Sequence, residues 1–579
     1  MDMVNIKING MSYEVATGST ILEAAREAGI DIPTLCFLKD INQIGACRMC
    51  MVEVKGARSL VAACVYPVNE GMEVFTNTPK VQKSRKMTLE MLLSVHDKKC
   101  LSCKRSGICE LQKLCNDMGI SDENRFEGAV PAGKKDYSTL HLERDNAKCI
   151  LCRRCVAACQ QQHVAVIGAN NRGFDTEIGC AFEQPLSYVS CVSCGQCINA
   201  CPTGALTEKD CTQDVIDAIN DPDKIVIVQT APAVRAALGE EFGMPIGTNV
   251  EGKMVAALRR LGFDKVFDTD FGADMTIMEE ATEFIDRVKN GGKLPIITSC
   301  SPGWVKFCEH YYPNLTENLS SCKSPQQMAG ALIKTWYAEK EGIDPSKIVS
   351  VSVMPCVAKK FEIMRNDEAA AGLPDVDISI STRELARMIK MAQLNFARLP
   401  EEDFDPAMGV STGAATIFGA TGGVLEAALR TAADVLEGTD HANVEYKEIR
   451  GTQGFKEAIY KVAGMDVKVA VVSGLNNANE LLSKIEKGEA DYHIVEVMCC
   501  PGGCVNGGGQ PIQPSSVRSF TDIKALRAKA LYDEDEAKTL RKSHLNPIVH
   551  ECYEWMGGPA GCHKAHEILH TTYVKRDRF

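Results

Sequence analysis

Several features that would assign the chain to other broad classes of protein are missing from its 579 residues. No apolar run reaches the roughly 18 residues that a membrane-spanning helix needs, and the opening MDMVNIKING does not resemble a signal peptide. With 76 acidic against 64 basic side chains, the formal net charge of −12 argues against a nucleic-acid partner. We therefore expect a cytoplasmic protein without a membrane span, and the chain length predicts several domains.

Signatures for binding nucleotide cofactors are also absent. No G-x-G-x-x-G segment connects a predicted strand to a predicted helix, and no flavin fingerprint occurs. Chemistry on NAD(P)H would therefore need partner subunits that bind the nucleotide or a flavin. A basic carrier protein or a complementary subunit face would suit the acidic chain.

Cysteine, by contrast, is abundant, with 27 residues. Disulfide frameworks belong mainly to small secreted chains, so a large chain without an export signal favours metal thiolates instead. A series of such centres in one stretch predicts an electron relay in a reducing, oxygen-poor setting. Four groups of candidate ligands occur in the first 201 residues, and these are Cys36/Cys47/Cys50/Cys64, His96/Cys100/Cys103/Cys109, Cys149/Cys152/Cys155/Cys159 and Cys191/Cys194/Cys197/Cys201.

The first two groups differ in their ligand chemistry. Strand-like VNIKING and YEVATG, followed by TILEAAREAGI with helical spacing, predict a small β-rich domain over residues 1–80. Its four cysteines suit a [2Fe–2S] centre, with a four-cysteine zinc site as the alternative. The second group, over residues 81–120, joins His96 to three cysteines, which predicts a [4Fe–4S] cluster. A neutral imidazole removes one negative charge and is expected to shift the cluster potential.

The third and fourth groups form a repeat. The runs CILCRRCVAAC and CVSCGQCINACP both follow the C-x2-C-x2-C-x3-C spacing of a two-[4Fe–4S] ferredoxin, which we place over residues 140–212. In such pairs the fourth cysteine of each run ligates the cluster of the other run. The predicted ligand sets are therefore Cys149, Cys152, Cys155 and Cys201 for one cluster, and Cys191, Cys194, Cys197 and Cys159 for the other.

Beyond the ferredoxin-type repeat the pattern becomes α/β. Apolar runs KIVIVQT, KLPIITSC, IVSVSVMPC, VKVAVVSG and DYHIVEVM predict strands, and EEATEFIDRVKN and ELARMIKMAQ predict helices. Cysteines follow three of these strands, in TSCSPGW, MPCVAKKFE and EVMCCPGGCVNGGGQP. Because α/β folds place ligand sites at strand ends, these cysteines predict one deeply placed metal site.

The three segments resemble the signature segments of [FeFe]-hydrogenases, whose usual forms are TSCCPxW, MPCxxKxxE and ExMxCxxGCxxGGGxP. The resemblance covers nearly the whole chain and is closest to the catalytic subunits of NADP-reducing multi-subunit hydrogenases and to clostridial single-chain enzymes. It implies a multidomain α+β and α/β architecture: a β-grasp [2Fe–2S] domain, a His/Cys3 cluster domain and a two-[4Fe–4S] ferredoxin domain. It further implies an α/β H-cluster domain over residues 213–515 and a small-subunit-like segment over residues 516–579.

The same resemblance implies an activity and its cofactors. The activity is the reversible conversion of two protons and two electrons into H2. The implied H-cluster is a [4Fe–4S] cubane that shares a cysteine sulfur with a two-iron subsite carrying CO, cyanide and an azadithiolate. Three further [4Fe–4S] clusters and one [2Fe–2S] cluster would relay electrons to or from a ferredoxin or NAD(P)H- and flavin-binding subunits. Maturation proteins are implied as further partners.

Site residues carried over from the resemblance fall into three sets. Cys356 and Cys500 match cubane ligands, Cys504 matches the bridging thiolate, and Lys359 would bind a cyanide by a charge-assisted hydrogen bond. The second set is the implied proton path, and the third is the implied cofactor pocket. Their members are Cys300, Glu280, Ser320, Glu283 and Arg287 for the path, and Ala231, Pro232, Ala233, Gln326, Met354, Phe418 and Met498 for the pocket. Without the resemblance, the two glutamates of the path would be interpreted as a solvated helix face, and the pocket residues largely as ordinary core.

One departure from the family pattern concerns the cubane. Where the family has two adjacent cysteines, a proton donor and a ligand, this chain has Cys300 and Ser301, and Cys499 stands where alanine is common. Ser301 could ligate through oxygen, Cys300 could turn inward, or Cys499 could supply the thiolate; a deliberately introduced Ser301 is a further alternative. The proline after Ser301 restricts how far Cys300 can turn. We favour Ser301 or Cys300 at this position.

Two rival functions remain. The front of the chain also resembles the iron–sulfur subunit of respiratory NADH dehydrogenases, which would make the protein a non-catalytic electron-transfer subunit. The three downstream segments argue against that reading. A sensory hydrogenase homologue with low turnover is the second rival, and the retained proton-path residues argue for catalysis instead.

Overall fold

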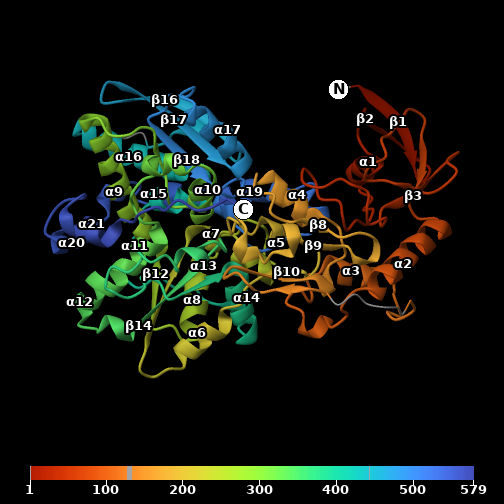
Figure 1. Cartoon of the computed structure of the whole chain (residues 1–579), viewed down its shortest axis with the longest axis horizontal. Coiled ribbons are helices and arrows are strands. Elements are labelled where there is room, and N and C mark those ends of the chain that lie inside the picture. Colours follow the sequence, from red (N-terminus) through yellow and green to blue (C-terminus); the bar gives the residue numbers. More distant parts are fainter. Residues whose placement is uncertain (1, 127–132, 442–443, 579) are drawn as a thin grey trace. The chain divides into compact units, whose positions relative to one another are not determined.

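The computed structural model describes residues 2–126, 133–441 and 444–578, which divide into two compact units. Unit one comprises Met1–Val189, Ala200–Thr207 and Ile512–Thr521, and unit two comprises Ser190–Asn199, Glu208–Pro511 and Asp522–Phe579. Both mix helices and strands (Figure 1). Among the described residues, no helix combines the length and apolarity that crossing a bilayer requires.

Unit one begins with a five-stranded sheet in the order β2-β1-β5-β3-β4. Helix α1 begins after Thr20, whose side chain forms a reciprocal capping box with Glu23. Its buried face, including Ile21 and Leu22, packs against Ile6 and other strand residues. The predicted strands and helix of residues 4–30 are thereby confirmed. The elements are β1 (Met3–Ile8), β2 (Met11–Ala16), α1 (Ile21–Glu27), β3 (Met51–Val54), β4 (Val61–Ala62) and β5 (Glu73–Phe75).

The rest of unit one is dominated by short elements separated by cysteine-bearing loops. Strands β6 and β7 pair antiparallel, as do β8 and β9. The loops place the cysteines beside short helices. These elements are α2 (Pro79–Ser94), α3 (Glu110–Asp117), β6 (Lys135–Asp136), β7 (Leu142–Asp145), α4 (Arg154–Gln161), β8 (Gly168–Asn170) and β9 (Glu177–Gly179).

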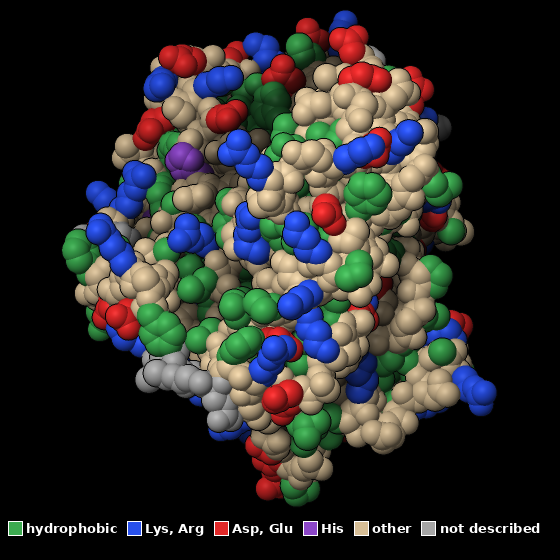
Figure 2. Space-filling model, turned by 90° about the vertical axis from the view of Figure 1, so that its right-hand side faces the viewer, with side chains coloured by type: hydrophobic (Ala, Val, Ile, Leu, Met, Phe, Trp, Pro, Cys, Tyr) green, Lys and Arg blue, Asp and Glu red, His purple; other side chains and the backbone are tan. Residues whose placement is uncertain are grey.

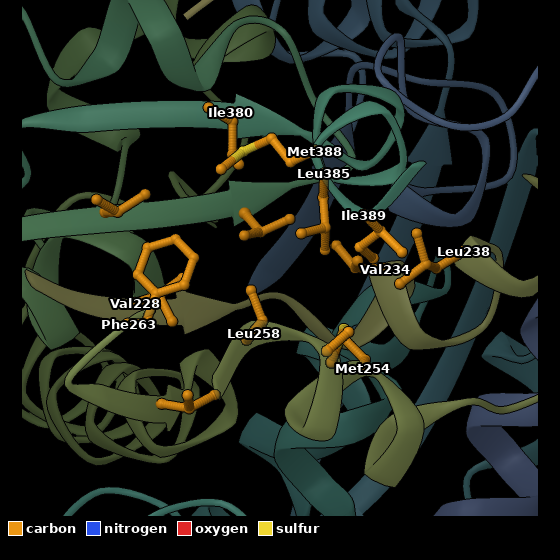
Figure 3. Close-up of a cluster of buried hydrophobic side chains, with 14 of the residues drawn as sticks. Val228, Val234, Leu238, Met254, Leu258, Phe263, Ile380, Leu385, Met388 and Ile389 are labelled. Carbon is orange, nitrogen blue, oxygen red and sulfur yellow. The ribbon is translucent and has the colours of Figure 1, made fainter. Parts of the chain in front are cut away.

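Unit two contains a parallel four-stranded sheet in the order β12-β11-β14-β15. Its strands are buried over nearly all of their length, as expected for a parallel sheet covered by helices, although serines interrupt the apolar runs of β14 and β15. Figure 3 shows part of this core, where Val228 on β11 and Ile380 on β15 face side chains such as Leu258 and Leu385 from the covering helices. The strands are β11 (Ile225–Thr230), β12 (Lys265–Asp268), β14 (Ile348–Met354) and β15 (Ile378–Ser381).

A second sheet of unit two has the order β13-β18-β17-β16, in which only β16 runs antiparallel to its neighbour. The strand predicted from KLPIITSC is confirmed only over its two isoleucines. Pro295 just before them has no N–H to donate to a ladder, and the residues after them turn into the site. The strands are β13 (Ile296–Ile297), β16 (Phe455–Val462), β17 (Met465–Ser473) and β18 (Ile494–Met498).

Helices of unit two include the two predicted from sequence: EEATEFIDRVKN lies within α9, and ELARMIKMAQ is helical as far as Met391, where α14 ends. Helix α16 carries Arg430, whose guanidinium is fully buried and forms ion pairs with Glu426 on the same helix and Asp535 on α19. The principal helices are α6 (Thr212–Ile219), α7 (Pro232–Arg235), α8 (Glu251–Leu261), α9 (Thr269–Asn290), α10 (Pro302–Tyr311), α11 (Pro325–Leu332), α13 (Lys359–Glu362), α14 (Thr382–Met391), α16 (Gly423–Glu437), α17 (Leu475–Glu486), α19 (Ile523–Ala537), α20 (Pro547–Met556) and α21 (His563–Leu569).

Candidate functional site

A cavity of about 530 Å³ lies in unit two, where the carboxyl ends of strands from both sheets meet. Strand β14 ends at Met354 and β18 at Met498, and both side chains line the cavity. Loops and helix starts supply the other walls. The lining residues are Ala231, Pro232, Ala233, Thr269, Ala273, Cys300, Pro325, Gln326, Met354, Pro355, Cys356, Lys359, Phe418, Gly419, Met498 and Cys504.

This lining contains all seven residues that the sequence assigned to the cofactor pocket, together with Cys300, Cys356, Lys359 and Cys504. The structure thus brings them together from segments far apart in the chain. Sequence reasoning missed Thr269, Ala273, Pro325, Pro355 and Gly419. None of the five carries an ionisable group or a metal-binding side chain, although Pro325 and Pro355 stand next to predicted residues.

Three thiols converge beside the cavity, with Cys500 buried and Cys356 and Cys504 half-buried. Burial raises the pKa of Cys356, and the neighbouring thiols of Cys500 and Cys504 raise it further, because each would oppose a second negative charge. Burial likewise raises the pKa of Cys504 to about 12, with Cys500 adding to the effect. Such thiols remain protonated unless a cation compensates the thiolates. The three therefore have the donor chemistry and the neighbourhood that an iron–sulfur centre needs.

The position of Cys504 beside the cavity depends on the backbone conformation of Gly503. Its φ of +97° lies in the left-handed region, and a Cβ there would meet the Thr421 nitrogen at 2.6 Å. Only glycine is compatible with both conditions. The glycine pair of the PGGC segment thus lets the backbone turn so that Cys504 reaches the cavity.

Lys359 presents a buried positive charge at the cavity wall. Its Nζ donates to Ser324 Oγ at 2.8 Å, to Glu362 Oε2 at 2.8 Å and to the Cys300 carbonyl at 3.3 Å. Burial opposes the charge, but Glu362 outweighs it and raises the pKa of Lys359. The ammonium therefore stays charged inside the protein and is available to an anionic group in the cavity.

The predicted proton path is built largely on helix α9. Glu280 is 2% exposed, and burial followed by the charge of Glu283 raises its pKa to about 8. Ser320 Oγ donates to Glu283 Oε2 at 3.1 Å, and Arg287 pairs with the other oxygen of Glu283. Burial and then Glu280 raise the pKa of the Cys300 thiol. Five proton-exchanging or polar groups thus lie in series from the cavity toward the partly exposed Arg287.

Ser301, which stands where the family pattern has a cysteine ligand, contacts the third signature segment through a hydrogen bond. The N–H of Cys499 donates to Ser301 Oγ at 3.2 Å, and Ser301 occupies the N-cap of α10. The Cys499 thiol is 3% exposed and hydrogen-bonds with the thiols of Cys194 and Cys500, which raise its pKa. Ser301, Cys499 and Cys500 are therefore neighbours, and neither Ser301 nor Cys500 lines the cavity itself.

In unit one, the first cysteine group converges closely. The Cys36 thiol hydrogen-bonds with those of Cys47 and Cys64, and Cys50 hydrogen-bonds with Cys64. The hydrogen bond from Cys47 lowers the pKa of Cys36 to about 2, and that from Cys64 lowers the pKa of Cys50 to about 7. The same hydrogen bonds raise the pKa values of Cys47 and Cys64, which therefore keep their protons. Four thiols that converge in this way form a suitable set for a small cluster.

The second group combines a buried imidazole with thiols that lie near one another. His96 Nδ1 is buried and has no hydrogen-bond partner among the described residues. Burial lowers the pKa of His96, which favours the neutral imidazole that binds metals. Burial also raises the pKa of Cys109, whose thiol lies near Cys103. An orphaned buried nitrogen of this kind fits a role as ligand.

The third group lines a cavity of about 370 Å³ in unit one. Cys149, Cys152, Cys155 and Cys201 all face it. Burial raises the pKa of Cys149 to about 12, and Cys201 adds to the effect. This combination takes three cysteines from one run and the last cysteine from the other. Of the remaining predicted ligands, Cys159 belongs to unit one, while Cys191, Cys194 and Cys197 belong to unit two.

The fold and these thiol-lined centres define an iron–sulfur oxidoreductase with a buried site in an α/β domain. Family models agree with this class. The iron only hydrogenase large subunit, C-terminal domain, matches residues 224–508, and the iron hydrogenase small subunit matches residues 521–576. The other matches are a 2Fe-2S iron-sulfur cluster binding domain (1–79), the NADH-ubiquinone oxidoreductase-G iron-sulfur binding region (85–124) and a 4Fe-4S dicluster domain (148–205).

Relatives extend the match over the full length. The chain is 50% identical to NADP-reducing hydrogenase subunit HndD of Solidesulfovibrio fructosivorans, covering 100% of both chains. It is 45% identical to iron hydrogenase 1 of Clostridium pasteurianum, covering 99% of this chain and 100% of that one. An apo structure of [FeFe]-hydrogenase HydA1 from Chlamydomonas reinhardtii superposes with a TM-score of 0.57 at 41% identity, covering 64% of this chain and 100% of that one.

The chain belongs to the iron-only, or [FeFe], hydrogenase family. It is an oxidoreductase that interconverts H2 with protons and electrons, and its iron–sulfur domains support electron relay. The resemblance drawn from the three signature segments is thereby confirmed. The match over residues 224–508 argues against a simple electron-transfer subunit, because that reading rests on the front of the chain alone.

Proposed function

We propose that this hydrogenase holds an H-cluster at the unit-two cavity, with Cys356 and Cys500 as cubane ligands and Cys504 as the bridging thiolate. One observation carries the proposal: the thiols of Cys356, Cys500 and Cys504 lie close together, and Cys356, Cys504 and the charged Lys359 line a single cavity of about 530 Å³. The H-cluster, when bound, supplies the redox chemistry that makes and breaks the H–H bond.

The chain's own residues would position that group and move protons. Lys359 would hold a cyanide by a charge-assisted hydrogen bond while Glu362 keeps the lysine charged. Gln326 is fixed by Ser352, which donates to its Oε1 at 2.7 Å, and by Glu362, which accepts from its Nε2 at 2.9 Å. Cys300, Glu280, Ser320, Glu283 and Arg287 would carry protons between the cavity and solvent.

For the accessory centres we propose one [2Fe–2S] cluster and three [4Fe–4S] clusters. The convergence of thiols in the first group, the orphaned nitrogen of His96 and the cavity lined by four cysteines support the first three. The domain boundaries 1–80, 81–120, 140–212, 213–515 and 516–579 go with this proposal. The proposed ligands are Cys36, Cys47, Cys50 and Cys64; His96, Cys100, Cys103 and Cys109; Cys149, Cys152, Cys155 and Cys201; and Cys191, Cys194, Cys197 and Cys159.

Electrons would be exchanged with a ferredoxin or with NAD(P)H- and flavin-binding subunits, in the cytoplasm. The relative HndD is by name a subunit of an NADP-reducing hydrogenase, which supports a multi-subunit partner. Charge is unevenly distributed over the surface: Lys and Arg side chains gather near the centre of the face shown in Figure 2, although the net charge is −12. A partner with an acidic docking surface would suit that face.

Infrared spectroscopy of the anaerobically matured protein tests the proposed function. We expect sharp CO and cyanide bands together with H2 evolution from reduced methyl viologen. Bands without turnover would instead support the sensory homologue. Iron–sulfur signals without such bands would contradict the proposed H-cluster and leave an electron-transfer protein.

A separate experiment identifies the fourth cubane ligand, which we propose to be Ser301. Protein produced without maturation proteins would carry the cubane alone, so electron paramagnetic resonance reports on it without contribution from the two-iron subsite. We expect Ser301→Ala to convert the cubane signal to that of a three-iron cluster, and Cys499→Ala and Cys300→Ala to leave it four-iron. Loss of the fourth iron in Cys499→Ala or Cys300→Ala, with Ser301→Ala intact, would transfer the assignment to that cysteine.

A further inference from the structure

Glu283 has hydrogen-bond partners in two directions, and the proposed proton path uses only one of them. Its Oε2 accepts from Ser320 Oγ at 3.1 Å and also from the N–H and the hydroxyl of Ser321, at 3.0 and 3.2 Å. Ser320 leads back toward Glu280. Ser321 opens a second direction that the path from Cys300 to Arg287 does not use.

The second direction continues into the C-terminal segment. Ser321 Oγ lies 2.8 Å from His570 Nδ1, and His570 Nε2 lies 3.0 Å from Glu279 Oε2. An imidazole exchanges protons at both ring nitrogens and is the side chain best suited to do so near neutral pH. The chain Glu283–Ser321–His570–Glu279 is therefore continuous within hydrogen-bonding distance.

Glu279 is held as an acceptor at the end of this chain. Tyr553 OH donates to its Oε1 at 2.6 Å and the Gly561 N–H donates to its Oε2 at 3.0 Å. Glu279 is 1% exposed, so its carboxylate has little water to compensate its charge. A protonated His570 would provide that compensation through a charge-assisted hydrogen bond from Nε2.

His570 also lies close to solvent. Its side chain is 8% exposed, and its ring centroid is 3.9 Å from that of His566, which is exposed on α21. The branch thus connects a buried relay residue to an imidazole at the protein surface. A smaller side chain at position 570 would leave room for an imidazole beside the exposed His566.

We propose that Ser321 and His570 form a proton-loading branch of the relay, in which His570 holds a second proton beside Glu283. The inference rests on the proposed function. A protonated Glu283 gives its proton to Ser321 Oγ while the Ser321 hydroxyl proton passes to His570 Nδ1, leaving a carboxylate at Glu283 and an imidazolium at His570. The reverse transfer returns the proton. Because each H2 formed consumes two protons, a loaded branch supplies the second without waiting for solvent.

Replacement of His570 by asparagine tests the branch. Asparagine can accept and donate hydrogen bonds but cannot take up a proton, so H2 evolution is expected to fall about fivefold, a small part of the 10²–10⁴ range of general acid–base effects. Infrared bands are expected to stay unchanged. In His570→Ala, added imidazole is expected to restore the rate, which a merely structural role would not allow. His563→Asn, at an exposed position of the same helix, serves as the matched control.

Ser321→Ala provides an independent variant. It keeps the Ser321 N–H bond to Glu283 but removes the hydroxyl bridge, and we expect the same loss of rate. The double variant Ser321→Ala/His570→Asn should be no slower than either single one, because both interrupt one branch. Wild-type rates in His570→Asn and Ser321→Ala, or no restoration by imidazole with intact bands, would overturn the proposal. If His570→Ala loses its bands, the rate of Ser321→Ala decides. Absence of bands and turnover in the wild type would instead count against the proposed function.

Discussion

Glu280→Gln is expected to lower H2 turnover at least about 100-fold while the CO and cyanide bands persist. Glu280 is the carboxyl nearest to Cys300 along the proposed path, and no solvent route replaces a group that is 2% exposed. Burial raises its pKa to about 8, so the carboxyl is protonated at neutral pH and glutamine matches its shape and charge. The variant should therefore fold normally and lose only proton exchange.

The pH dependence of stability gives this prediction a second readout. Glu280 titrates near 4.5 when unfolded and near 8 when folded, so the folded state binds the extra proton between these values. Stability is unaffected by this group below the unfolded pKa and decreases as the pH rises toward 8. Glu280→Gln should remove that decrease, which thermal unfolding at several pH values would show. Asp286→Asn, on the exposed side of the same helix, is the control for turnover. Near-normal turnover in Glu280→Gln would contradict its place in the path.

The largest expected effect on stability comes from Arg430→Met. The Arg430 guanidinium donates to Glu426 at 2.7 Å, to both oxygens of Asp535 at 2.9 Å and to the Val444 carbonyl at 2.7 Å. Removing it leaves two buried carboxylates with less compensation, and breaking a buried pair in this way costs about 3–5 kcal/mol. We expect a clearly lower thermal unfolding midpoint.

Arg260→Met is the matched control, because it removes the same charge from an exposed ion pair instead of a buried one. Arg260 pairs with Glu402 at 2.7 Å, but its side chain is 37% exposed. Exposed pairs are worth about 0–1 kcal/mol, so Arg260→Met should leave the midpoint nearly unchanged. Equal effects of the two variants would show that the buried position of Arg430 does not matter.

The sequence predicted the cavity better than it predicted the connections around it. The seven pocket residues were recognisable through the family resemblance. Only Met354 and Met498 among them belong to the signature segments, and both stand at strand ends, where ligands gather. Thr269 and Ala273 carry no chemical signal and line the cavity only because α9 passes beside it. The contact of Ser321 with His570 joins residues 249 positions apart and depends on tertiary packing that no local pattern encodes.

Secondary structure shows the same limit. The run KLPIITSC has the composition of a full strand, but Pro295 and the turn toward Cys300 leave a ladder of two residues. Strands β12 and β15 are short and lie beside longer neighbours, so only their pairing with β11 and β14 identifies them. Composition thus predicted the longer central strands, whereas the short strands beside them are determined by tertiary packing.

The discontinuity of unit two has a consequence for biosynthesis. The unit is complete only when Asp522–Phe579 joins Glu208–Pro511, so a stretch synthesised after all the signature segments completes it. Leu531 of α19 lies against Gly419 at the cavity wall, and His570, just after the end of α21, reaches Ser321. A nascent chain that already displays every signature cysteine would still lack these contacts. Insertion of the proposed H-cluster into a finished pocket would therefore require Asp522–Phe579, and a chain truncated before them would offer thiols without the surroundings that protect them.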